Sequence, residues 1–329
     1  MEDSIKSRIY FYTKADKQNG FGHLTRQLLL YKKFKKKKFK CYFLKDGIDK
    51  KLTRKFKFNF SKYTLKNLLK NKNNKDKIFL IIDRYDIDDL LQREIKKNKI
   101  RFLLFDNIKS LKSKYIYSDI VVNIDPSVEK KIYLKRSKNK NIKILNGFKY
   151  SILKEKVIKN KNKIYDYLVS FGGSCNQNLY KNFLNEFQKR IKEKKILVIL
   201  GFSNSKIKLK IINRNKIILK KMVNNMQKSM MLSKNIVCAG GTTLLESLRY
   251  KIKRNVLVIA KNQKSISDYY LKKKYISNIG YFYLKKKISD NFFDKIINDK
   301  KFEVKIIKSK NKGSDLIFNE ILRFHKNES

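Results

Sequence analysis

The sequence predicts an α/β fold of two domains, each built on a sheet of parallel strands. Short apolar runs of strand length alternate with longer amphipathic stretches, and this alternation starts again after a lysine-rich segment in the middle of the chain. Glycine pairs follow two of the apolar runs, at the strand ends where parallel sheets hold ligands. The length of 329 residues agrees with two domains, because one domain takes roughly 150 residues.

The first domain is expected to cover residues 1–150. Its apolar runs are rich in Ile, Leu, Val and Phe, as parallel strands buried on both faces are. Strands are therefore expected over residues 8–13, 39–44, 78–82, 101–105 and 119–124. Between them, apolar residues recur at helical spacing, which predicts helices over residues 24–34 and 87–97.

The second domain is expected to cover residues 151–329, and its first part, residues 154–163, resembles a polar linker. The same rhythm then predicts strands over residues 165–171, 195–200, 235–238 and 255–260. It predicts helices over residues 179–191, over residues 222–232 and from residue 244 onward. A last helix is expected over residues 315–324, and it could dock on either domain.

The composition excludes a disordered chain and argues against nucleic-acid binding. Hydrophobic residues make up 42% of the chain, which is enough for two cores despite a formal net charge of +54. Only 12 of the 82 basic residues are arginines, whose planar guanidinium suits phosphate and base recognition. The 70 lysines are spread over nearly every segment, as a coding bias toward A+T would spread them. We expect no nucleic-acid partner, and protein partners stay open.

The cysteines and histidines lead to further expectations. Cys41, Cys175 and Cys238 form no CxxC pair, so a reduced, cytoplasmic chain is expected. The longest apolar runs are of strand length, so no membrane insertion is expected. His23 and His325 are the only histidines and no cluster shows ligand spacing, so neither a metal site nor a cofactor is expected.

A first candidate site follows the first expected strand, where Gly20, Gly22, His23 and Arg26 occur together. Glycines there permit positive φ and let a ligand approach the main chain. His23 would stand at the opening of a helix, where the dipole favours the neutral imidazole that can accept a proton. The alternative is a helix-capping turn in which the histidine only caps or packs.

A second candidate site lies at a glycine turn of the second domain. Gly240, Gly241 and Thr242 follow a strand and would direct backbone N–H groups and a hydroxyl at one spot, which suits a diphosphate. Glu246 could accept hydrogen bonds from the two ribose hydroxyls of a nucleotide. Its alternative role is to complete a capping box with Thr243.

Further candidates follow other strands of the two domains. Gly172 and Gly173 take the same strand-to-helix position at the start of the second domain. The amides of Asn262 and Gln263 suit recognition of a sugar hydroxyl or N-acetyl group, and a helix cap by Asn262 is the alternative. In the first domain, Asp83, Tyr85 and Asp106 follow strands. The first two are expected to line a cleft, whereas Asp106 is as readily explained as a helix cap.

These motifs occur in the order found in a known family, and the resemblance covers residues 8–283. The motifs are GFGH followed by Arg26, DRY from Asp83, GFKYSIL from Gly147, SFGGS, CAGGTTLLE and AKNQ. They resemble the UDP-sugar hydrolases of pseudaminic acid biosynthesis, which are similar to the peptidoglycan N-acetylglucosaminyltransferase. The resemblance implies a GT-B-like architecture, with two Rossmann-type domains that face a central cleft.

The resemblance also implies an activity. Members of this family hydrolyse UDP-2,4-diacetamido-2,4,6-trideoxy-β-L-altropyranose by attack of water at the anomeric carbon, without a metal, and release UDP and the free sugar. Here His23 would be the proton acceptor and Asn262 a substrate contact, while Gly240 and Gly241 with Glu246 would hold UDP. The other expected substrate-binding residues are Gly20, Gly22, Arg26, Tyr85, Gly172, Gly173, Thr242 and Gln263. A GT-B glycosyltransferase that uses a UDP-sugar donor is the alternative function.

The sequence departs from the family pattern at two notable positions. Lys14 stands where an arginine is usual, and Cys175 stands where the family has an acid after the GG pair. These departures concern sugar specificity more than the fold.

Overall fold

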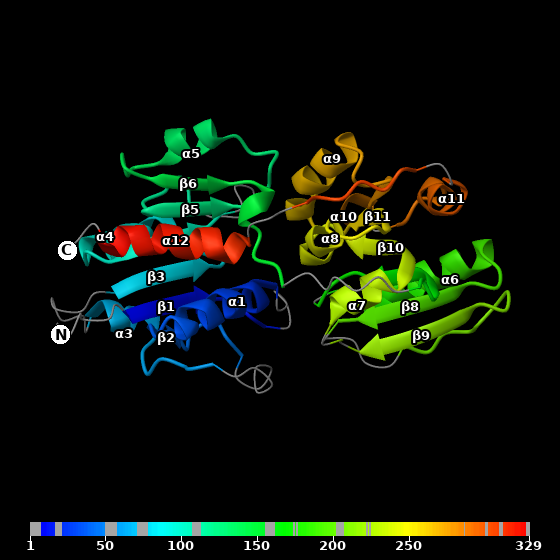
Figure 1. Cartoon of the computed structure of the whole chain (residues 1–329), viewed down its shortest axis with the longest axis horizontal. Helices are drawn as coiled ribbons and strands as arrows, with labels where there is room; N and C mark the ends of the chain where they lie inside the picture. Colours follow the sequence, from blue (N-terminus) through cyan, green and yellow to red (C-terminus); the bar gives the residue numbers. More distant parts are fainter. Residues whose placement is uncertain are drawn as a thin grey trace. The chain divides into compact units, whose positions relative to one another are not determined.

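The computed structural model describes residues 8–16, 22–49, 58–70, 78–106, 113–154, 162–173, 175, 177–201, 207–221, 223, 225–285, 287–299, 302–308 and 312–326. The chain divides into two compact units, Met1–Leu153 with Ser309–Ser329 and Lys154–Lys308. Each unit contains a six-stranded sheet in which neighbouring strands run parallel, with helices packed on it (Figure 1). The predicted α/β fold with two parallel sheets is therefore confirmed.

The first unit has the strand order β2-β1-β3-β4-β5-β6. Its strands are β1 (Arg8–Thr13), β2 (Lys40–Phe43), β3 (Ile78–Asp83), β4 (Arg101–Phe105), β5 (Ile120–Asn123) and β6 (Lys143–Asn146). Its helices are α1 (Gly22–Lys36), α3 (Leu65–Lys70), α4 (Asp89–Lys97), α5 (Lys130–Arg136), the 3-10 turn η1 (Phe148–Tyr150) and α12 (Gly313–Lys326). Five strands lie where the sequence predicted them, and β6 was not predicted.

Strand β3 shows why its sequence is apolar throughout. Successive side chains of a strand point to opposite faces, so Phe79 and Ile81 enter the core on the α1 face, whereas Leu80 and Ile82 enter the core on the other face. Every residue of β3 is buried. The strand ends at Asp83, on the carboxyl edge of the sheet.

Helix α12 belongs to the first unit, which corrects the expected second domain of residues 151–329. Phe318 packs edge-on against Phe34 of α1 with ring centroids 4.8 Å apart, and an ion pair joins Lys33 to Asp315. Ile321 is completely buried in the same core. An amphipathic helix must bury its apolar face, and here that face packs against α1 and the first sheet.

The second unit has the strand order β12-β11-β10-β7-β8-β9. Its strands are β7 (Tyr165–Ser170), β8 (Lys195–Leu200), β9 (Lys216–Lys221), β10 (Ser233–Ala239), β11 (Lys253–Val258) and β12 (Asn278–Tyr281). Its helices are α6 (Gln177–Arg190), α7 (Met226–Met231), α8 (Thr242–Ser247), η2 (Lys261–Gln263), α9 (Lys264–Lys272), α10 (Phe282–Lys285) and α11 (Asp290–Asn298). The edge strands β9 and β12 were not predicted.

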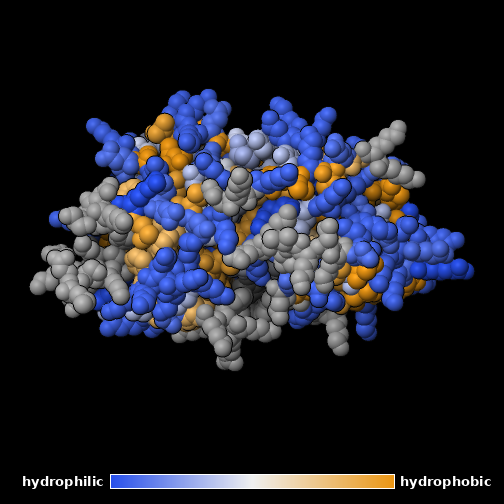
Figure 2. Space-filling model, viewed as in Figure 1, coloured by the Kyte–Doolittle hydropathy of each residue, from blue (hydrophilic) through white to orange (hydrophobic). Residues whose placement is uncertain are grey.

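The visible face of the molecule is mostly polar. Figure 2 shows a face covered mostly by hydrophilic residues, with apolar residues scattered among them. Within the described ranges, none of the helices combines the length and apolarity that a membrane span needs. All three cysteines are buried and free, and burial raises the pKa of each thiol to about 12.

Candidate functional site

A polar cluster forms where β1 and β3 end and α1 begins. Thr13 and Asp83 are paired in the parallel register of the two strands, and the Thr13 hydroxyl donates to the Asp83 carbonyl over 3.1 Å. On α1, His23, Arg26 and Gln27 are spaced three and four residues apart, so they share one face of the helix. That face meets the side chain of Asp83.

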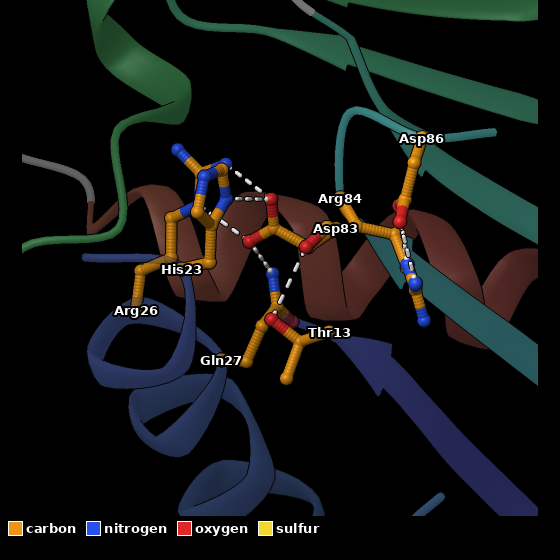
Figure 3. Close-up of polar contacts among 7 residues, drawn as sticks. All are labelled: Thr13, His23, Arg26, Gln27, Asp83, Arg84 and Asp86. Carbon is orange, nitrogen blue, oxygen red and sulfur yellow. Dashed lines mark hydrogen bonds and ion pairs between the residues drawn. The ribbon is translucent and has the colours of Figure 1, made fainter. Parts of the chain in front are cut away.

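The Asp83 carboxylate accepts hydrogen bonds from all three helix residues (Figure 3). The distances are 2.7 Å from His23 Nδ1 to Oδ1, 2.6 Å from Arg26 Nε to Oδ2 and 2.7 Å from Gln27 Nε2 to Oδ2. Arg26 Nη2 also donates to Oδ1, so the guanidinium holds the carboxylate with two nitrogens. The side chain of Asp83 is 1% exposed, and this network compensates the cost of burying its charge.

The electrostatics keep Asp83 ionised. Burial alone would raise its pKa, but the charge of Arg26, the interaction with His23 and the hydrogen bonds from both hold that pKa well below its usual range. Two acceptors 2.7 Å apart would repel each other, so Nδ1 of His23 carries a proton and donates it to the carboxylate. In the neutral ring this leaves Nε2 as the nitrogen that can accept a proton.

This arrangement suits a general base. A carboxylate bonded to Nδ1 fixes both the tautomer and the orientation of an imidazole whose Nε2 takes a proton. Tyr85 further confines the ring, because it packs edge-on against His23 with centroids 4.7 Å apart. Arg26 pairs with Asp83, so the pair itself carries no net charge.

The sequence placed His23, Arg26, Asp83 and Tyr85 near one edge, and the structure brings their side chains together. It did not predict that Asp83 would bond His23, or that Gln27 would join them. The guanidinium of Arg26 lies on Asp83 and 5.0 Å from the centroid of the Phe105 ring, and its expected contact with substrate stays a prediction. The signal that could have predicted this network is the His-x-x-Arg-Gln spacing, which puts three side chains on one helix face, together with an Asp at the end of a neighbouring strand.

Of the two glycines expected at this site, the structure describes only Gly22. Gly22 is the exposed first residue of α1, so the main chain is accessible beside His23. Gly20 lies outside the described residues. Nearby, Lys14 pairs with Asp86 over 3.2 Å, so the lysine at the departing position still forms an ion pair.

Asp106, at the end of β4, has the opposite electrostatic behaviour to Asp83. Burial raises its pKa to about 6, although the charge of Arg136 and the neighbouring hydroxyl of Tyr133 oppose this. The ion pair is long, with Arg136 Nη1 3.7 Å from Oδ2. The residues that follow, 107–112, lie outside the described residues, so a helix cap by Asp106 stays a prediction.

The raised pKa of Asp106 predicts a pH dependence of stability. The folded chain binds the proton of the Asp106 carboxyl more tightly than the unfolded chain does. The stabilisation that comes from this protonated carboxyl is therefore full below about pH 4 and is lost as the pH rises through about 6. Asp106→Asn should therefore raise the free energy of unfolding at pH 7.5 by about 2–3 kcal/mol and change it little at pH 4. Urea unfolding of both proteins at the two pH values measures this. An equal change at both pH values would contradict the assignment.

In the second unit, the turn between β10 and α8 approaches α9 closely. A Cβ on Gly240 would lie 2.3 Å from Ser267 Oγ, so only glycine fits there. Gly241, the next residue, has space: its nearest atom would be Gln263 Nε2 at 4.0 Å. Thr242 begins α8 and is exposed. The turn therefore has one packed and one open glycine.

Glu246 lies half-buried on α8. Burial raises its pKa, and the charges of Lys154 and Arg249 oppose this. The alternative of a capping box with Thr243 is wrong, because Gly241 is the N-cap of α8 and no side chain caps it. Ribose recognition by Glu246 stays a prediction.

A second glycine turn follows β7. Gly172 has φ of +93°, which favours glycine. A Cβ on Gly201, at the end of β8, would lie 2.4 Å from the carbonyl oxygens of Gly172 and Gly173, so these backbones touch. Gly201 was not singled out from the sequence, although a glycine directly after a strand was the signal. Cys175, where an acid was expected from the family, is buried in the core beside this turn.

The two amides after β11 have separate surroundings. Asn262 is the N-cap of neither η2 nor α9, which rules out its expected alternative role as their cap. Gln263 does not stand free: its Oε1 accepts from Ile259 N over 3.1 Å and from Gly240 N over 3.2 Å. Among the described residues, no group of three or more His, Cys, Asp or Glu side chains is placed to hold a metal ion.

Comparisons with known proteins extend these observations. No protein-family model matches the chain. It is similar to the UDP-2,4-diacetamido-2,4,6-trideoxy-beta-L-altropyranose hydrolase of Campylobacter jejuni, with 26% identity over 285 residues that cover 82% of this chain and 97% of that one. The resemblance predicted from the motifs is confirmed.

Solved structures show the same architecture. MurG of Acinetobacter baumannii has a TM-score of 0.57 at 10% identity and covers 89% of this chain and 90% of its own. The UDP-GlcNAc 2-epimerase of Methanocaldococcus jannaschii has a TM-score of 0.55 at 12% identity, covering 96% and 99%. These likenesses confirm a GT-B-like fold with two Rossmann-type units.

Proposed function

We propose that the chain is a UDP-sugar hydrolase that releases UDP and 2,4-diacetamido-2,4,6-trideoxy-L-altrose in pseudaminic acid biosynthesis. The observation that carries this proposal is the His23–Asp83 pair, in which a buried carboxylate fixes the imidazole with Nε2 as the proton acceptor. The curated relative supports the substrate, since its name is that of a hydrolase of this UDP-sugar.

In the proposed reaction, His23 Nε2 takes a proton from water as the water oxygen attacks the anomeric carbon. The bond between that carbon and the UDP oxygen breaks, and the electron pair leaves with UDP. General-base catalysis of this kind contributes on the order of 10²–10⁴ in rate. Asp83 stabilises the imidazolium that forms, while Arg26 and Gln27 hold the carboxylate in place.

We assign recognition of UDP to the second unit. The open face of Gly241 admits a diphosphate to the main chain, and Glu246 would accept the ribose hydroxyls. The half-buried Gly172 and the exposed Gly173 form a second backbone turn, and Asn262 would contact the sugar. N–H groups and the many lysines supply the positive potential for the leaving diphosphate, so we expect no metal requirement.

The experiment that tests the function is incubation with UDP-2,4-diacetamido-2,4,6-trideoxyaltrose and a panel of other UDP-sugars, with EDTA and without any acceptor. NMR should show release of UDP together with the free sugar of inverted anomeric configuration. If turnover appears only after an acceptor hydroxyl is added, the chain is a glycosyltransferase that uses the same donor.

Two neighbouring glycines give a matched test of the UDP site. Gly241→Ala adds a methyl group to open space, so the melting temperature should stay unchanged while UDP affinity falls by about tenfold or more, or about 1.4 kcal/mol. Gly240→Ala instead drives a methyl group into Ser267 and should destabilise the fold by about 1–3 kcal/mol. Calorimetric titration with UDP and thermal unfolding separate the two effects. Unchanged UDP affinity in Gly241→Ala would place the diphosphate elsewhere.

A further inference from the structure

We infer that Gln263 is a positioning residue that holds the Gly240–Gly241 turn in the shape needed for UDP. This inference rests on the proposed function, and it reassigns a residue that the sequence had placed among the substrate contacts. Its Oε1 accepts two backbone hydrogen bonds, from Ile259 N over 3.1 Å and from Gly240 N over 3.2 Å. Ile259 follows β11 and Gly240 follows β10, so one amide oxygen joins the ends of two neighbouring strands.

The orientation of this amide is determined by its partners. Both partners are N–H donors, so the atom between them must be the acceptor oxygen and Nε2 must point the other way. The backbone of Gln263 is fixed as well, because its N–H donates to the Ala260 carbonyl over 3.0 Å and the residue is the N-cap of α9. Gln263 is therefore held at both its main chain and its side chain.

The glycine turn rests on this support. A Cβ on Gly240 would meet Gln263 Cβ at 3.0 Å as well as Ser267 Oγ at 2.3 Å, so the backbone of Gly240 lies directly against α9. Gly241 faces open space. Gly240 thus packs the turn against α9, while the backbone of Gly241 stays open to a ligand. Gln263 holds the turn through its hydrogen bond with the N–H of Gly240.

A comparable link lies under the other glycine turn of this unit. The Tyr180 hydroxyl accepts from Phe171 N over 2.8 Å and donates to the Ile199 carbonyl over 3.0 Å. Phe171 lies between the end of β7 and Gly172, and Ile199 belongs to β8. In both turns one side chain, buried for Tyr180 and half-buried for Gln263, bonds the backbone at two strand ends. The backbone of the glycines themselves is left for a ligand to contact.

A direct sugar contact through Oε1 is disfavoured by the same geometry. Such a contact would compete with two backbone N–H groups for the amide oxygen, and an unpaired buried N–H costs more than a typical hydrogen bond contributes. The effect of Gln263 should consequently reach the affinity for UDP itself, whereas a sugar contact would affect only the UDP-sugar.

The test uses Gln263→Met, which keeps the length of the side chain but removes the acceptor. UDP affinity by calorimetric titration should fall by about 10- to 100-fold, as expected for the loss of two hydrogen bonds. Amide hydrogen exchange of Gly240 and Ile259, followed by NMR, should become faster. Asn262→Ala is the matched control, and it should leave UDP affinity and both exchange rates unchanged while lowering turnover of the UDP-sugar.

A second variant separates the oxygen from the rest of the side chain. Gln263→Glu keeps an acceptor for both N–H groups, so Gly240 and Ile259 should stay protected from exchange even though the added charge weakens UDP binding. Wild-type UDP affinity or unchanged exchange in Gln263→Met overturns the inference. A wild-type protein that binds UDP but hydrolyses no UDP-sugar overturns the proposed function alone, and one that does not bind UDP overturns both.

Discussion

Replacing His23 with alanine is expected to lower the turnover number of UDP-sugar hydrolysis by about 10²- to 10⁴-fold, because water then loses its proton acceptor. UDP affinity should stay within about twofold of the wild-type value, since His23 belongs to the first unit and UDP recognition is assigned to the second. Single-turnover measurements of UDP release, together with calorimetric titration of UDP, measure the two quantities. Wild-type turnover in His23→Ala would refute the base.

His23→Asn is the matched control for this prediction. Its side-chain amide can replace Nδ1 as a donor to Asp83, but it has no basic nitrogen in place of Nε2. The variant should therefore keep more of the wild-type stability than His23→Ala and show the same loss of turnover. If turnover recovered in His23→Asn, the role of the ring would be to support Asp83 rather than to accept a proton.

The fold could be predicted largely because its central strands are buried on both faces. A run such as that of β3 has few alternatives to a strand in a parallel sheet. The edge strand β9 escaped prediction because half its residues are lysines and most of it is exposed. The sequence of α12 showed an apolar face but not its partner, and the contact between Phe318 and Phe34 spans most of the chain.

The candidate site was predictable by position but not by pairing. Glycines and polar residues after strands indicated which edge of each sheet carries chemistry, because strand ends and helix starts meet there. That Asp83 bonds His23 depends on the register of β3 beside β1 and on the rotation of α1, which no local pattern fixes. For the same reason the sequence did not show that the Gln263 side-chain oxygen accepts from the backbone N–H groups of Gly240 and Ile259, at the ends of two neighbouring strands.

Asp83→Asn is expected to affect stability and catalysis together. The partly buried guanidinium of Arg26 would lose its anionic partner in this buried site, which costs about 3–5 kcal/mol in the free energy of unfolding. The pKa of Asp83 is lowered in the folded state, so its stabilising effect is present above about pH 4 and is lost as the pH falls through the lowered value. Asp83→Asn should lack this part of the acid sensitivity, which urea unfolding between pH 7 and pH 2 measures.

Turnover in Asp83→Asn should fall by about 10²- to 10⁴-fold, because His23 loses the carboxylate that fixes its tautomer and stabilises its protonated form. Adding Arg26→Met to this variant removes the unpaired cation, so stability should largely return while turnover stays low. That outcome separates positioning of the base from support of the fold, and recovery of both would mean that Asp83 acts only on stability.

Asp86→Asn is the control at the same sheet edge: Asp86 is 31% exposed in its ion pairs, so stability should change by about 1 kcal/mol or less.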